Sequence, residues 1–129
     1  MQMHVEKFAA RYNGNCVIRP YGFVHNVEVM MSASDCIISK PGGLTVSEAL
    51  AKNLPMLLAD PIPGHEERNV DFLVNNGMAA LITRHFPVDE AVYELFTNPV
   101  RLETVRHTMK AVAHPDATER LADFVLALQ

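Results

Sequence analysis

The sequence predicts an α/β fold in which a parallel β-sheet is covered by helices on both faces. Short apolar, β-branched runs recur along the chain, and segments with helical spacing separate them. This alternation is typical of parallel sheets, because two parallel strands need a crossover that is usually a helix. Loops rich in glycine and proline follow the strand-like runs, at the carboxyl ends where such sheets bind ligands.

The first part of the chain contains both kinds of segment. Residues 3–12 have apolar side chains at helical spacing, and Asn13-Gly14-Asn15 marks the end of that predicted helix. The run Cys16-Val17-Ile18 predicts a short strand. Apolar spacing from Val24 to Met31 predicts a short helix, and the run at residues 36–38 predicts the next strand.

The middle of the chain repeats the alternation. Residues 46–50 carry the apolar face of the first long helix, and residues 54–59 form an apolar run expected for a strand buried on both faces. Residues 60–65 are too rich in proline for regular structure and predict a loop. Helical spacing over residues 66–76 ends at an Asn-Gly pair, and residues 78–82 predict another strand.

The C-terminal third, residues 88–128, predicts two or three amphipathic helices with breaks at residues 98–99 and 114–116. Only three or four strands can therefore be counted, fewer than the typical five or six of a sheet. The first predicted element is also a helix without a strand before it. We therefore expect the chain to be a fragment that lacks sequence upstream of Met1.

Composition excludes several classes of protein. A net charge of −4 without a basic cluster argues against a nucleic-acid binder. No apolar run approaches the ~20 residues of a membrane span, and no secretory segment is present, so we expect a cytoplasmic protein. Cys16 and Cys36 lie in strand-like runs, and we expect both to be reduced and buried. The histidines show no metal-ligand spacing, so no metal site is predicted.

The most informative stretch is residues 39–48, Ser-Lys-Pro-Gly-Gly-Leu-Thr-Val-Ser-Glu, between a strand-like run and a helix. Pro41 fixes one φ angle, while Gly42 and Gly43 lack the Cβ atoms that keep a ligand from the main chain. The first turn of the helix offers unpartnered amides at the positive end of the helix dipole, which together form an anion site. We expect a phosphate there.

The same stretch also has a purely structural interpretation. Thr45 and Glu48 have the spacing of a capping box, in which their side chains satisfy amides at the helix start. Lys40 could offset the charge of a phosphate, but the Gly-Lys-Ser/Thr order of a P-loop is absent, and a solvated lysine is the alternative. His25 could also reach the phosphates, with a surface histidine as the alternative.

Five motifs follow one another along nearly the whole chain: Gly22-Phe23-Val24, Met30–Asp35, Ile38–Ala49, Pro55 and Pro63–Asn69. Together they resemble the donor-binding half of GT-B type glycosyltransferases. The resemblance extends to monogalactosyldiacylglycerol synthase, the processive diacylglycerol glucosyltransferases and the peptidoglycan N-acetylglucosaminyltransferase that acts on a lipid carrier.

The resemblance implies a fold and an activity. The fold would be the Rossmann-like C-terminal half of a GT-B enzyme without its first strand or strands, and residues 1–129 would form one UDP-sugar binding domain. The activity would be inverting transfer of a hexose from a UDP-sugar to a lipid such as diacylglycerol, without cofactor or metal. The N-terminal acceptor domain, with the general base, would be missing, so this chain alone would be inactive. The parent enzyme could contact the inner face of the cell membrane.

The resemblance also implies which residues meet the nucleotide. Main-chain groups of Phe23 and Val24 would pair with uracil. The structural alternative is that Phe23 is a core aromatic, and both can hold because the base contact is through the backbone. The diphosphate would lie on the glycine loop and helix start, which comprise Gly42, Gly43, Leu44 and Thr45. Glu48 would accept hydrogen bonds from both ribose hydroxyls, a role that suits an acceptor-only carboxylate.

The segment that would meet the sugar comprises Gly64, His65, Glu66, Glu67 and Asn69. The family usually has glutamine in place of His65 and glycine in place of Arg68, so the identity of the sugar is left open. The alternative for Glu67 is that it only complements the helix dipole.

Other functions are compatible with the sequence. The chain could be a non-catalytic UDP-sugar binding module, a natural subunit of a split glycosyltransferase, or a remnant that binds nothing. A UDP-sugar 2-epimerase of the same overall fold matches the motifs less well. Binding of UDP in preference to ADP would separate the remnant from the other readings.

Overall fold

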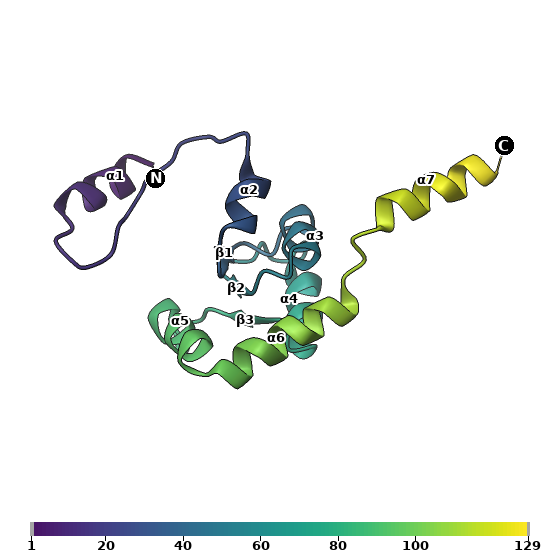
Figure 1. The fold of residues 1–129 in the computed structure, drawn as a ribbon. Helices are drawn as coiled ribbons and strands as arrows, with labels where there is room; N and C mark the ends of the chain where they lie inside the picture. Colours follow the sequence, from purple (N-terminus) through teal and green to yellow (C-terminus); the bar gives the residue numbers. More distant parts are fainter. Residues whose placement is uncertain (1, 129) are drawn as a thin grey trace.

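A computed structural model describes residues 2–128 and shows a three-stranded parallel sheet with helices around it (Figure 1). The strands are β1 (Ile37–Ser39), β2 (Met56–Leu58) and β3 (Ala79–Leu81), and their order in the sheet is β1-β2-β3. Ile37 lies opposite Met56, which in turn lies opposite Ala79. The predicted parallel sheet is therefore confirmed, with β2 at its centre.

Seven helices accompany the strands within the described residues. They are α1 (Gln2–Arg11), α2 (Val27–Ser32), α3 (Gly43–Ala51), α4 (Glu67–Asn75), α5 (Val88–Thr97), α6 (Pro99–Val112) and α7 (Ala117–Ala127). Each matches a predicted helix to within a few residues. Helix α3 forms the crossover from β1 to β2, and α4 forms the crossover from β2 to β3.

Local sequence explains where several helices begin and end. Asn98 caps α6 with its side chain, which accepts a hydrogen bond from Arg101 N at 3.1 Å, and Pro99 occupies the first helical position. Helix α4 is followed by Gly77 with φ of 69°, a left-handed conformation that glycine adopts without steric cost. Asn53, with φ of 52°, follows α3 in the same manner.

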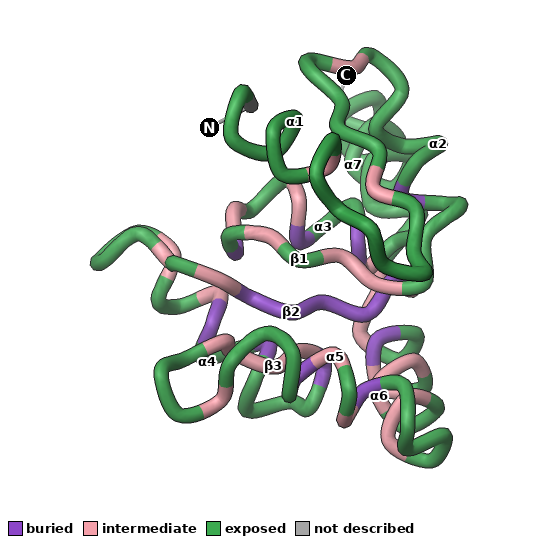
Figure 2. Tube along the Cα trace, turned by 90° about the vertical axis from the view of Figure 1, so that its left-hand side faces the viewer, coloured by how far each residue is buried: buried purple, intermediate pink, exposed green. Residues whose placement is uncertain are grey.

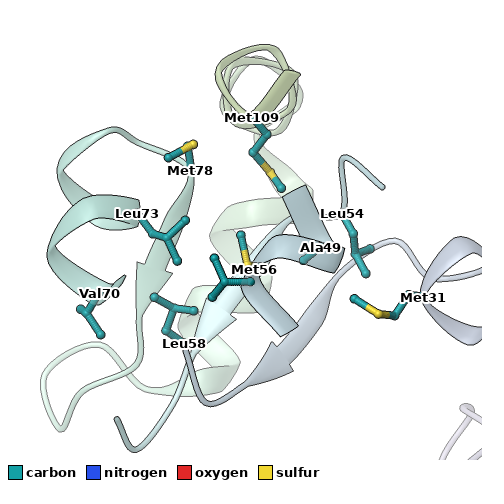
Figure 3. Close-up of a cluster of buried hydrophobic side chains, with 10 residues drawn as sticks. Met31, Ala49, Leu54, Met56, Leu58, Val70, Leu73, Met78 and Met109 are labelled. Carbon is teal, nitrogen blue, oxygen red and sulfur yellow. The ribbon is translucent and has the colours of Figure 1, made fainter. Parts of the chain in front are cut away.

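Apolar side chains cover the sheet on both faces. On one face Met56 and Leu58 join side chains from α2, α3, α4 and α6, including the fully buried Leu73 (Figure 3). On the other face Leu57 packs with Ala91 and Leu95 of α5. Figure 2 shows the resulting burial of β2 along its whole length. The prediction of a strand buried on both faces is thus confirmed.

The two terminal helices lie away from this core. Figure 1 shows α1 and α7 extending from the sheet in different directions. Their apolar side chains are correspondingly exposed, with Phe8 at 60% and Leu121 and Phe124 at 63%. Within residues 2–128, no helix combines the length and the hydropathy that crossing a bilayer requires.

The strand predicted at residues 16–18 is wrong. These residues are irregular, and Val17 is 78% exposed. A strand needs a hydrogen-bonded neighbour, whereas the sheet formed by the described residues begins with β1. The predicted burial of Cys16 fails for the same reason, because its thiol is exposed. Cys36, which directly precedes β1, is half-buried, and desolvation raises the pKa of its thiol to about 11.

The two cysteines should therefore differ in reactivity towards iodoacetamide. At pH 8 roughly one Cys36 thiol in a thousand is ionised, since the thiolate fraction falls tenfold for each pH unit below the pKa. We expect one rapid alkylation per chain, at Cys16, and a slow one at Cys36 that speeds up about tenfold between pH 8 and pH 9. Mass spectrometry of a time course measures both rates, and Cys16→Ser isolates the slow one. Equal rates at the two thiols would contradict the burial of Cys36.

Candidate functional site

The loops that follow β1 and β2 meet at the carboxyl edge of the sheet. The two strands are paired in parallel, and Ala59 N donates to Ser39 O at 2.9 Å just where both strands end. The next residues of the two loops, Lys40 and Asp60, form an ion pair at 2.9 Å. The predicted solvated lysine is therefore paired, although its side chain is still 52% exposed.

Helix α3 begins at this edge with a glycine cap. Its N-cap is Gly42, with φ of −65° and ψ of 140°, and no side chain caps the helix. Val46 N donates to Gly42 O, which leaves the amides of the preceding first turn without an intrahelical acceptor. The capping-box interpretation is wrong, because the helix starts at Gly43 and Thr45 already lies inside it.

The side chains beside this helix start point to solvent. Leu44 is 84% exposed, and Glu48 is also exposed one turn later on the same side of the helix. A Cβ atom built on Gly43 would meet nothing within 4 Å, so the space beside the first turn is open. Thr45 is half-buried. The geometry thus leaves an uncapped helix end with an accessible carboxylate nearby.

The loop after β2 folds back towards the glycine loop. Gly64 has φ of 77°, and Asp60 holds the less common left-handed conformation of a non-glycine residue, with φ of 48°. Glu66 accepts a hydrogen bond from Ile62 N at 2.8 Å through Oε2. Its other oxygen, Oε1, would lie 3.5 Å from a Cβ atom built on Gly42. The Glu66 carboxylate therefore holds its own loop and lies against the glycine loop.

Asn69, in the first turn of α4, connects this loop to the helix start of α3. Its amide Nδ2 donates to Pro41 O at 2.8 Å, and Asn69 is half-buried. Gly42, Glu66 and Asn69, predicted separately, are thus brought together. His65 and Glu67, in contrast, are exposed, and the space beside Gly64 is open.

The predicted base-binding corner stands apart from this cluster. Phe23 is 89% exposed, so the core-aromatic alternative is wrong. Its ring and the ring of His25 pack in a T-shaped arrangement, with centroids 4.9 Å apart and planes at 83°. Among the described residues, no hydrogen bond or ring contact connects Phe23 or Val24 with the glycine loop.

Sequence reasoning missed Asp60 as a member of the site. The signal was weak, since an aspartate in a loop rich in proline is common. The combination of a position directly after a buried strand with a residue type that tolerates the left-handed region could have indicated it. Its partner Lys40 was considered, but a pairing between two loops cannot be read from spacing.

A separate cavity of about 550 Å³ is lined by residues outside these loops. It is lined mainly by apolar side chains of β3, α5 and α6 and by residues such as Pro55 and Gly77 that precede β2 and β3. None of the predicted site residues lines it. The cavity is therefore distinct from the carboxyl-edge site, whose free amides, lysine and carboxylate together suit a ligand with anionic and hydroxyl groups.

Comparisons with known proteins found a matching family profile and similar sequences. The profile described as "Glycosyltransferase family 28 C-terminal domain" matches residues 2–121. The processive diacylglycerol beta-glucosyltransferase of Bacillus pumilus (strain SAFR-032) is 35% identical over 95 residues, which cover 74% of this chain and 25% of that protein. The protein of the same name from Bacillus cereus (strain AH187) is 31% identical over 110 residues, which cover 85% and 28%. This chain thus spans about a quarter of the length of these relatives.

Solved structures show the same fold. MurG from Acinetobacter baumannii aligns with 95% of this chain and 36% of its own, at a TM-score of 0.73 and 25% identity. The glycosyltransferase SnogD from Streptomyces nogalater aligns with 85% of this chain and 29% of its own, at a TM-score of 0.59 and 21% identity. The second likeness concerns the fold alone.

Two glycines of the site should respond differently to alanine. Gly64→Ala should lower the free energy of unfolding by about 1 kcal/mol, because a Cβ atom is unfavourable at positive φ. Gly43→Ala should change it by less than about 0.5 kcal/mol, since Gly43 is not in the left-handed region and has open space beside it. Urea unfolding of both variants measures the difference. Equal effects would mean that the loop around Gly64 has another conformation.

Proposed function

This chain belongs to the family of glycosyltransferase family 28 C-terminal domains, and we propose that within this family it binds the UDP-sugar donor for transfer of a hexose to a lipid acceptor. The resemblance predicted from the motifs is thereby confirmed at the level of the family. The names of the two relatives, processive diacylglycerol beta-glucosyltransferases, support glucose as the hexose and diacylglycerol as the acceptor.

The observation that carries the proposal is the start of α3, which has a glycine cap and no side-chain cap. Amides in the first turn of a helix attract anions through their free N–H groups and through the helix dipole. The absence of a Cβ atom at Gly43 leaves space for a diphosphate to reach these amides. Lys40 lies beside this loop, but its charge is already paired with Asp60, so the proposal depends on the amides.

The remaining contacts follow from the positions around this anion site. Glu48 is exposed one turn into α3, and we assign its carboxylate to the ribose hydroxyls. We assign the base to the main chain at Phe23 and Val24. The exposed side chains of His65 and Glu67 remain available for the sugar. We place the reaction at the cytoplasmic face of a membrane, because diacylglycerol is a membrane lipid.

The proposed chemistry is direct displacement at the anomeric carbon with inversion. As the bond to UDP breaks, negative charge grows on the diphosphate. Amides at the start of α3 and the hydroxyl of Thr45 would then bind the transition state more strongly than the ground state, which accelerates the reaction. We assign the general base that activates the acceptor to a separate acceptor domain, so that this chain alone binds the donor without transferring sugar.

Isothermal titration of this chain with nucleotides tests the proposal. We expect UDP to bind at least about tenfold more tightly than ADP, since the edge of uracil but not that of adenine is recognised. Equal affinities for UDP and ADP would contradict the assignment of uracil to the main chain at Phe23 and Val24. No binding of either nucleotide would support the alternative that the chain is a remnant without a donor site.

The role of Glu48 has a direct test. Glu48→Ala should weaken UDP binding about 10- to 100-fold, because hydrogen bonds to a charged acceptor contribute about 1.5–3 kcal/mol. Glu103, an exposed carboxylate on α6, provides the control: Glu103→Ala should leave the affinity for UDP unchanged. If both variants bind UDP like the unchanged chain, Glu48 does not contact the ribose.

A further inference from the structure

We propose that Asn69 is a positioning residue that holds the phosphate-binding amides of the glycine loop, and not a residue that contacts the sugar. The inference rests on the proposed function and changes one of its assignments. The family resemblance placed Asn69 with the sugar-contacting residues, whereas its side chain makes a hydrogen bond to the glycine loop.

The hydrogen bond joins two segments that are far apart in the chain. Asn69 lies in the first turn of α4 and Pro41 lies 28 residues earlier, before the N-cap of α3. The distance from Asn69 Nδ2 to Pro41 O is 2.8 Å, within the normal range for an N–H···O bond. Pro41 is fully buried and Asn69 is half-buried, so solvent competes less for this bond than at an open surface.

The accepting carbonyl belongs to the peptide group that also contains the Gly42 amide. This peptide is planar and trans, so its C=O and its N–H point in opposite directions. A donor fixed on Pro41 O therefore also fixes the direction of Gly42 N–H, which points away from Asn69. Because Gly42 is the N-cap, this peptide also sets how the chain enters α3.

Glycine makes this restraint necessary. A glycine loop has more accessible backbone conformations than any other, and Gly42 and Gly43 follow each other directly. A phosphate binds best to amides that are already oriented, because otherwise part of the binding free energy is lost in ordering them. Asn69 supplies the restraint from a helix, which is a more rigid support than a loop.

Glu66 adds a second contact between the loop before α4 and the glycine loop. Its Oε2 accepts from Ile62 N at 2.8 Å, which closes the segment that leads into α4. Its Oε1 lies close enough to Gly42 to make van der Waals contact with a Cβ atom built there. The loop before α4 and the loop before α3 therefore lie against each other, and Asn69 connects them.

Titration with UDP and with UDP-glucose separates a positioning role from a sugar contact. Asn69→Ala should weaken both ligands about fivefold, as expected for the loss of about one hydrogen bond, and leave the ratio of their affinities unchanged. Asn69→Asp should weaken both further, because a carboxylate can only accept and would face the carbonyl of Pro41. Weakening of UDP-glucose alone, with UDP unaffected, would overturn the proposal and support the sugar contact.

Asn75→Ala is the matched control, since Asn75 is exposed at the other end of α4. It should leave both affinities unchanged. Thermal unfolding of all variants without nucleotide shows whether the substitutions disturb the fold. A fold lost on Asn69→Ala would make the residue structural and overturn the proposal, unless Asn69→Ser, which keeps a short donor, restores both stability and UDP affinity.

A second measurement needs no ligand. In two-dimensional NMR spectra of the free chain, Asn69→Ala should shift the amide resonances of Gly42 and Gly43, while Asn75→Ala should not. Unchanged glycine resonances would overturn the proposal. If the unchanged chain does not bind UDP, the proposed donor site fails, and the NMR comparison still decides whether Asn69 holds the glycine loop.

Discussion

Burial of β2 on both faces determines where the neighbouring helices pack and where they begin. Its three side chains are buried alternately under α5 on one face and under the helices that include α3 and α4 on the other. Both crossover helices must therefore cover the same face of neighbouring strands, and each starts at the carboxyl edge. Packing in the core thus places the two helix starts of the candidate site side by side. The ion pair between Lys40 and Asp60 and the hydrogen bond from Asn69 to Pro41 then connect their loops.

The electrostatics of this edge depend on short distances. The chain has a net charge of −4, and Glu48, Glu66 and Asp60 all lie close to the helix starts. The overall field therefore does not attract an anion. Helix amides act only within hydrogen-bond reach of the first turn, and Lys40 is already paired with Asp60. An anionic ligand would thus be recognised by the direction of a few N–H groups, which makes their orientation more important than the total charge.

The sequence predicted most of the fold and part of the site. Helices and strands with long apolar patterns, such as α4 and β2, were predicted because their periodicity comes from the same burial that the structure shows. The strand at residues 16–18 was wrong because strand formation depends on a neighbour, which no local pattern contains. The partners of Asn69 and Lys40 could not be predicted from the sequence either. Both belong to loops distant in sequence, and only the paired strands bring those loops together.

The order of the strands in the sheet repeats their order in the chain. Among the three strands of the described residues, none has to insert between two that are already paired, so β2 and β3 each pair with a strand that precedes them in the chain. During synthesis on the ribosome, β1 and β2 can dock once the segment up to Leu58 has emerged, and β3 then adds to the free side of β2. For these three strands, the topology favours stepwise addition in chain order, with little need for the earlier strands to rearrange.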